Sequence, residues 1–125
     1  MGALKYFLDT YAIIEIQKGN PSYKKISEEQ GVTSVFNLAE TYCILLGNSQ
    51  VLAEKTFEVL SKRLVEIPLD NVKKAMRFRK EFNEKNKAKL SYADAIAYTY
   101  ATENNLTFVT GDDAFKHLYK VLFIK

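Results

Sequence analysis

The 125-residue sequence predicts an α/β protein in which a parallel sheet lies between two layers of helices. Short apolar stretches alternate along the chain with longer stretches of helical periodicity, which favours parallel strands joined by helices. The chain has a size that commonly folds around a single core, so we expect one domain over residues 1–125. Its composition, 47% hydrophobic and 26% charged, is ordinary for a globular protein.

The first half of the chain begins with an apolar and aromatic run, LKYFLD, that is typical of a strand. Residues 10–19 follow with apolar residues at helical spacing and a stop at Gly19. Residues 20–31 start on Asn-Pro and end on glycine, which predicts a short polar helix. The next elements that we expect are a brief strand at 32–36 and helices at 37–47 and 49–63.

The second half repeats the alternation. An apolar run at 64–69, closed by Pro68, predicts a third strand, and a basic helix follows at 70–86. Residues 91–105 predict a helix, because apolar residues recur three and four positions apart from Ala93 to Ala101. The remaining predicted elements are a strand at 106–110, a short helix at 112–119 and a fifth strand at 121–124.

Two composition features narrow the function. No apolar run approaches the roughly 20 residues that span a membrane, and the N-terminal residues lack a signal-peptide pattern, so we expect a cytoplasmic protein. Cys43 and His117 are single residues of their type, which excludes an internal disulfide and a Cys/His zinc cluster. We expect Cys43 in the core and His117 at the surface or a helix end. Any metal would then have oxygen ligands, as Mg²⁺ or Mn²⁺ prefers.

Four acidic residues lie where a predicted strand gives way to a helix or in the first turn of a helix: Asp9, Glu40, Asp94 and Asp112. Any one of them, taken alone, is explained as a helix cap. Aspartate is a favoured N-cap, and the helix dipole stabilises an acid in the first turn by about 0.3–1 kcal/mol. The segments SYAD and NLAE also approximate the capping-box pattern.

Taken together, the four acids favour a different interpretation. All strands of a parallel α/β sheet end at the same edge, where ligands bind, so acids after several strands gather there. Such carboxylates repel one another unless a cation is present. A divalent metal with carboxylate and water ligands accounts for them, and it would polarise a phosphoryl oxygen and activate a water. The pattern therefore indicates phosphodiester hydrolysis.

Four segments resemble, in order and spacing, the acidic motifs of PIN-domain proteins: FLDTYAIIE, NLAET, SYADAIAYTYA and VTGDDAF. More narrowly, the chain resembles the small VapC-type toxins and their archaeal and bacterial relatives, nearly from end to end. The resemblance implies a Mg²⁺- or Mn²⁺-dependent endoribonuclease, the toxin of a type II toxin–antitoxin pair. It also implies RNA as substrate, a VapB-like antitoxin, a homodimer, and five parallel strands in the order 3-2-1-4-5.

By motif position, the resemblance implies that the metal-binding and catalytic carboxylates are Asp9, Glu40, Asp94 and Asp112. Thr10 and Thr110 would orient carboxylates or water, although a local cap or turn explains them equally well. Many relatives have a second acid two residues after the last one, where this chain has Ala114. Asp113 stands one residue earlier, and we expect it to be a helix-start residue or an outer contact of the metal.

The main alternative is a PIN module with little or no activity that acts as an RNA-binding or scaffold component of an RNA-processing complex. The presence of all four acids argues against it. Other phosphate chemistries fit less well, because the chain has neither a P-loop nor a dinucleotide-binding glycine motif. A receiver domain would show paired acids near the end of its first strand, and a haloacid-dehalogenase-type phosphatase would show Asp-x-Asp. Here Asp9 is single and is followed by Thr10 and Tyr11.

A basic segment at 71–90 has eight Lys/Arg residues against two Glu. The ordinary interpretation is the solvated face of an amphipathic helix. With a nuclease site at hand, the segment also becomes a candidate RNA-phosphate surface. The candidate residues are Lys73, Lys74, Arg77, Arg79 and Lys80.

Overall fold

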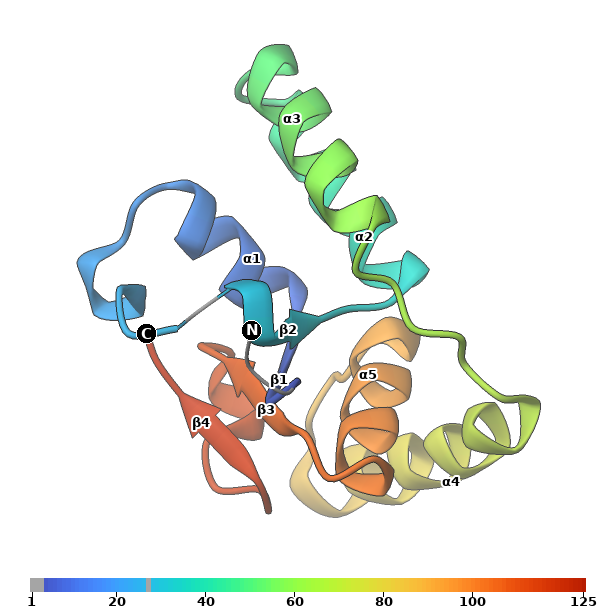
Figure 1. Cartoon of the computed structure of the whole chain (residues 1–125). Coiled ribbons are helices and arrows are strands. Elements are labelled where there is room, and N and C mark those ends of the chain that lie inside the picture. Colours follow the sequence, from blue (N-terminus) through green and yellow to red (C-terminus); the bar gives the residue numbers. More distant parts are fainter. Residues whose placement is uncertain (1–3, 27) are drawn as a thin grey trace.

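The computed structural model describes residues 4–26 and 28–125. Within them, four strands form one parallel sheet in the order β2-β1-β3-β4 (Figure 1). The strands are β1 (Tyr6–Leu8), β2 (Gly31–Val32), β3 (Thr107–Thr110) and β4 (Val121–Phe123). This confirms the predicted α/β class with helices on both faces. It also places the point where the strand order reverses between β1 and β3.

Alternating residues of the central strands pack against different helices. Phe7 and Phe108 contribute to a cluster with the helix α5 (Tyr92–Glu103). Their chain neighbours Leu8 and Val109 contribute to a second cluster with the helix α1 (Thr10–Gln17). All four side chains are at most 2% exposed. The period of two along each strand therefore produces one apolar core on each face of the sheet.

The predicted third strand at 64–69 is wrong, and the sheet of the described residues has four strands in place of the expected five. Leu64 makes only an isolated parallel bridge to Thr33, supported by the bond from the Val65 amide to the Thr33 carbonyl (2.9 Å). The segment then leaves the sheet edge, and Pro68 becomes the N-cap of the helix α4 (Leu69–Asn86). Proline has no backbone N–H to donate to a neighbouring strand and is well suited to the start of a helix. The apolar run therefore ends at Pro68 before it can extend the sheet.

The remaining helices follow the predicted boundaries with local corrections. Helices α2 (Val35–Leu46) and α3 (Gln50–Ser61) form a hairpin that extends away from the sheet (Figure 1). Ser34 caps α2 by accepting a bond from the Asn37 amide, so the helix takes over part of the predicted strand at 32–36. That strand is confined to Gly31–Val32.

Two predicted short helices are replaced by 3₁₀ turns. In place of a helix at 20–31 there are η1 (Pro21–Tyr23) and η2 (Glu28–Gln30), and Ser27 lies outside the described residues. In place of a helix at 112–119 there is only η3 (Asp113–Phe115). Both segments are rich in polar residues and anchor through one buried aromatic ring each, Tyr23 and Phe115, so a single turn is enough to place that ring.

The expectation that Cys43 lies in the core is wrong, because its side chain is exposed. The buried stripe of α2 runs through Leu38, Thr41 and Leu45, and Cys43 lies off this stripe. His117 is exposed, as expected. No helix in the described part of the chain is long and apolar enough to cross a membrane.

Candidate active site

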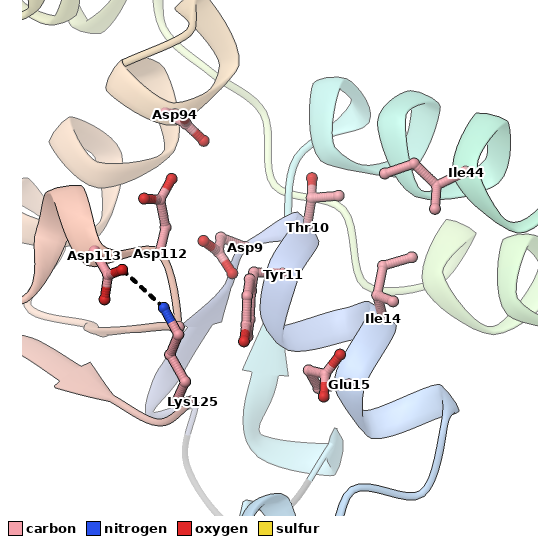
Figure 2. A pocket seen from close by; sticks show the side chains of 11 residues that line it. Asp9, Thr10, Tyr11, Ile14, Glu15, Ile44, Asp94, Asp112, Asp113 and Lys125 are labelled. Atoms are coloured by element: carbon pink, nitrogen blue, oxygen red, sulfur yellow. Dashed lines mark ion pairs between the residues drawn. The ribbon is translucent and has the colours of Figure 1, made fainter. Parts of the chain in front are cut away.

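Three of the four predicted acids line one cavity of about 450 Å³ at the edge of the sheet where the strands end. Asp9 follows β1, Asp112 follows β3, and Asp94 lies in the first turn of α5. Figure 2 shows their carboxylates pointing into the same space. Three distant parts of the sequence thus place negative charge at the point where the strand order reverses, as the strand-end argument predicted.

Asp9 is the buried member of the group, with 2% of its surface exposed. One carboxylate oxygen caps α1 by accepting a bond from the Ala12 amide (2.8 Å). The other accepts a bond from the Thr110 hydroxyl (2.5 Å). Burial raises the pKa of Asp9 to about 7, with Asp94 and Asp112 adding to the rise, although both hydrogen bonds oppose it.

Asp94 is part of a capping box at the start of α5, which confirms that interpretation of SYAD. The Ser91 amide donates to Asp94 Oδ2 (3.2 Å), and the Asp94 amide donates to the Ser91 hydroxyl (3.0 Å). Burial raises the pKa of Asp94, and the charges of Asp112 and Glu40 raise it further. The residue is therefore both a cap and a member of the charged cluster, so the two interpretations do not exclude each other.

Asp112 begins the turn η3 in the same manner. Its Oδ1 accepts a bond from the Ala114 amide (3.0 Å), and its own amide donates to the Thr110 hydroxyl (3.1 Å). Thr110 is fully buried and links Asp9 to Asp112 through these two bonds. The sequence left two interpretations of Thr110 open, a local cap or turn and a residue that orients carboxylates. In the structure Thr110 positions two of the acids.

Glu40 lies beside the cavity and not in its lining. Glu40 Oε1 accepts a bond from the Thr10 hydroxyl (2.8 Å), and Glu40 lines a neighbouring cavity with Cys43. Thr10 and Ile44 line both cavities, so the two spaces are neighbours. The capping-box interpretation of NLAE is wrong, because Ser34 is the N-cap and Glu40 belongs to the second turn of α2.

Asn37 is a residue that sequence reasoning missed. It is fully buried, its side-chain amide donates to Thr10 Oγ1 (3.2 Å), and its Oδ1 accepts a bond from the Ser34 hydroxyl (2.6 Å). This chain of bonds ties the start of α2 to the start of α1 and holds the Thr10 hydroxyl toward Glu40. Nothing in the local sequence distinguishes Asn37 from an ordinary first-turn asparagine.

Asp113 differs from its neighbour Asp112. Its side chain is 75% exposed, and its Oδ2 lies 2.9 Å from Lys125 Nζ. The bond from Lys125 lowers the pKa of Asp113. Lys125 also lines the cavity, and sequence reasoning missed it, although it follows the last strand and the strand-end rule would have included it.

Gly111 makes the edge possible by having no side chain. A Cβ at this position would lie 2.1 Å from the Tyr11 ring and 2.5 Å from the Ile124 carbonyl oxygen. Tyr11 and the end of the chain can therefore pack directly against the turn between β3 and η3. Any larger residue would push apart the segments that carry Asp9, Asp112 and Lys125.

The oxygen donors of the cavity fit a hard divalent cation. Within residues 4–26 and 28–125, no three Asp, Glu, His or Cys side chains already stand together as a ligand set. Mg²⁺ nevertheless binds through one or two carboxylates and keeps several waters. The capping bonds from backbone amides go to Asp94 Oδ2 and Asp112 Oδ1, and both carboxylates face the cavity (Figure 2). A cation there would also offset the repulsion that raises the pKa of Asp9.

The predicted basic surface lies largely apart from this cavity, and none of its five candidates lines it. Lys74 pairs with Glu103, in the last turn of α5, whereas Asp94 is in the first turn of that helix. Lys80 pairs with Glu84 on α4 itself. Arg79 donates to the Leu90 carbonyl (2.8 Å) and its guanidinium lies over the Tyr92 ring. Lys73 and Arg77 are exposed.

Comparison with solved structures shows the same fold in other proteins. A toxin–antitoxin complex from Klebsiella pneumoniae is 21% identical with a TM-score of 0.75, and the match covers 94% of this chain and 96% of that chain. VapBC2 from Rickettsia felis, bound to a DNA fragment from their promoter, is 16% identical with a TM-score of 0.69, over 97% and 98% of the two chains.

A third structure, the sarcin-ricin loop cleaving toxin VapC20 from Mycobacterium tuberculosis, is 14% identical with a TM-score of 0.70, over 94% of this chain and 98% of that chain. No curated protein matches the sequence. At these identities the structural likeness concerns the fold, which is shared with VapC-type toxins. The model of the PIN-domain family matches residues 6–121, and the chain therefore belongs to the PIN-domain family.

Proposed function

We propose that this chain is a Mg²⁺- or Mn²⁺-dependent endoribonuclease, the toxin of a type II toxin–antitoxin pair. The observation that carries the proposal is the cavity in which Asp9, Asp94 and Asp112 face one another at the strand-order reversal. Their hydrogen-bond donors in the described residues are backbone amides and one hydroxyl, so the cluster has negative charge available for a divalent ion.

A bound divalent ion would supply a polarised phosphoryl oxygen and an activated water. Asp94 and Asp112 would hold it through the oxygens that their caps leave free. Asp9 is fixed at both oxygens by Ala12 and Thr110, so it supplies charge from a rigid position. Its pKa of about 7 means that it is partly protonated at neutral pH, and a nearby cation would favour the ionised form.

Glu40 and Thr10 would act on the water side of the reaction. Their bond of 2.8 Å holds the glutamate in a cavity that neighbours the carboxylate cavity and shares Thr10 with it. A carboxylate in this place can accept the proton of a water that attacks a phosphodiester, either directly or through a second water. Asn37 supports this role by fixing the Thr10 hydroxyl.

RNA is the proposed substrate because one of the structural relatives is a sarcin-ricin loop cleaving toxin. An antitoxin is the proposed partner because two of the relatives are toxin–antitoxin assemblies. The α2–α3 hairpin offers apolar surface for a partner, since Phe36, Ile44, Val51 and Phe57 are all more than 40% exposed. A homodimer would also bury exposed apolar residues of this kind. We propose that the toxin and its antitoxin act in the cytoplasm.

The alternative function, an inactive PIN module in an RNA-processing complex, requires that the cavity has lost its chemistry. All four acids are present and three of them line one cavity, which favours the enzyme.

The proposal is tested with labelled single-stranded RNA, incubated with the wild-type protein and with Asp9→Asn, each in Mn²⁺ and in EDTA. Asp70→Asn is the matched control, because Asp70 is an exposed aspartate in the first turn of α4. We expect Mn²⁺-dependent cleavage by the wild type and the control, and none by Asp9→Asn. Equal cleavage by all three proteins, or none by the wild type, would contradict the enzyme and favour the binding module.

A further inference from the structure

Lys125 reaches the carboxylate cavity from a position that the fold fixes. The preceding residue, Ile124, is buried, and its amide donates to the Thr110 carbonyl (2.8 Å) just beyond the pairing of β3 with β4. The Ile124 carbonyl accepts a bond from the Tyr23 hydroxyl and lies close to Gly111. These contacts hold the backbone at Lys125 against the turn that carries Asp112.

The ammonium group of Lys125 is held loosely, in contrast to its backbone. Its ion-pair partner in the described residues is Asp113, at 2.9 Å, and the two side chains are 59% and 75% exposed. Ion pairs with this exposure contribute little stability, because water and salt screen them. Figure 2 shows the lysine side chain extended along the cavity toward Asp113, beside Asp112. The ammonium can therefore exchange Asp113 for another anion at little cost.

An RNA phosphate that enters this cavity meets five acidic side chains, namely Asp9, Glu15, Asp94, Asp112 and Asp113. Among the described residues that line the cavity, Lys125 is the one with a positive charge. Lysine binds phosphate as a compact point charge and needs no fixed orientation to do so. An incoming phosphate would relieve its repulsion most effectively at this ammonium group.

We propose that Lys125 is the phosphate-binding residue of the site, resting on Asp113 in the free protein and transferring to a phosphate of the RNA when the substrate enters. This inference rests on the proposed function, because it concerns the RNA of the same cavity. It gives Asp113 a role that differs from the outer metal contact expected from its position. Asp113 is a positioning residue that holds Lys125 at the entrance and competes with RNA for it.

The test measures binding of a labelled single-stranded RNA by fluorescence anisotropy in EDTA at several salt concentrations, and KM and kcat for the same RNA in Mn²⁺. The variants are Lys125→Met, Lys125→Arg, Asp113→Asn and the double variant Asp113→Asn/Lys125→Met. Lys116→Met is the matched control, since Lys116 lies over the same Phe123 ring as Lys125 (5.6 Å and 5.9 Å) but does not line the cavity.

We expect Lys125→Met to weaken RNA binding by about threefold to tenfold and to raise KM more than it lowers kcat. It should reduce the slope of log K against log salt by about 0.7, the value for one phosphate contact on a single strand. Lys125→Arg should restore binding, and Lys116→Met should match the wild type. Asp113→Asn should tighten binding, and this gain should disappear in the double variant.

Two results would overturn the assignment alone: wild-type binding and salt dependence in Lys125→Met, or tighter binding of Asp113→Asn that persists without the lysine. In both cases the wild type still cleaves RNA and the proposed function stands. If the wild type neither binds nor cleaves RNA, the proposed function fails and the role of Lys125 fails with it.

Discussion

Helix α4 and the carboxylate edge of the sheet both concentrate charge, but their charges have different partners. On α4, Lys74 pairs with Glu103 at 2.6 Å and Lys80 with Glu84 at 3.0 Å. At the sheet edge, Asp9, Asp94 and Asp112 accept bonds from neutral donors and form no ion pair with another described residue. Burial raises the pKa of Asp9 and of Asp94 at that edge, and neighbouring like charges add to the rise, whereas Lys74 on α4 lies beside the opposite charge of Glu103.

In this chain, charged residues that form local ion pairs are distinguished from charged residues that lie together without one. The density of Lys and Arg made 71–90 conspicuous in the sequence, yet the helix satisfies several of those charges locally. The acids at the edge are few and far apart in the sequence. The fold brings them together, and none of the three forms an ion pair with another described residue. A cluster that is costly for the fold needs a ligand to explain it.

The largest effect that we expect is on RNA cleavage, which a substitution at the carboxylate edge should reduce and a substitution on α4 should not. Asp112→Asn should reduce Mn²⁺-dependent RNA cleavage by more than about a hundredfold, because it removes a proposed ligand while the amide can still cap η3. Glu84→Gln, which removes an acid of α4 paired with Lys80, should leave cleavage unchanged. Cleavage rates under single-turnover conditions check both. Similar losses in the two variants would mean that the edge has no special role.

The next effect concerns stability and pH in the absence of metal. The pKa of Asp9 rises from 3.8 to about 7 on folding, so the folded protein binds the extra proton more tightly than the unfolded chain. The contribution of Asp9 to stability is therefore complete below about pH 4 and is lost as the pH rises through 7. In EDTA, the melting temperature of the wild type should fall between pH 5 and pH 8.

Asp9→Asn should flatten this fall, because it removes the ionisation and keeps an oxygen for the Ala12 amide. At pH 8 the variant should melt several degrees above the metal-free wild type, and the difference should be smaller at pH 5. Lys74→Met, a change in the paired region, should leave the pH dependence as it is in the wild type. A wild type and an Asp9→Asn variant with parallel curves would show that Asp9 is not the group responsible.

The smallest expected effect is on RNA binding by α4. Lys73 and Arg77 are exposed and form no ion pair with another described residue, and the neighbouring Lys74 contacts the far end of α5 from Asp94. Reversing both charges, with Lys73→Glu/Arg77→Glu, should weaken RNA binding by only about twofold to fivefold through the general field of the protein. Anisotropy measurements on the same labelled RNA check this. A loss beyond that of Lys125→Met would place the main RNA contact on α4.

The sequence was sufficient for the parts of the molecule that local rules determine. A strand end is visible in the sequence as the end of an apolar run, and parallel strands end at one edge of the sheet, so Asp9 and Asp112 could be predicted to lie together. Asp94 was added to them from its place in the first turn of a helix. The same rule, applied to the last strand, would have added Lys125. The capping box at Ser91 and Asp94 was also visible, because its residue types and spacing are specific.

Other features depend on tertiary contacts that no local pattern encodes. Whether the run at 64–69 is a strand depends on how far it follows Thr33, and the chain turns away after a single bridge. Asn37 reaches Thr10 across 27 positions of sequence. Glu40 also bonds to Thr10 and lies outside the lining of the main cavity. Glycine at position 111 indicated a turn in the sequence, but its close contact with Tyr11 could be seen only in the folded structure.

The most direct test of the account is a calorimetric titration of Mn²⁺ into the protein near pH 6.5, without RNA, for the wild type and for Asp9→Asn. We expect the wild type to bind Mn²⁺ and to release a proton as Asp9 ionises, so that the measured heat depends on the ionisation enthalpy of the buffer. Asp9→Asn should bind more weakly and show no such buffer dependence. Equal affinity and equal proton release in the two proteins, or no binding by the wild type, would contradict a metal site built on Asp9, Asp94 and Asp112.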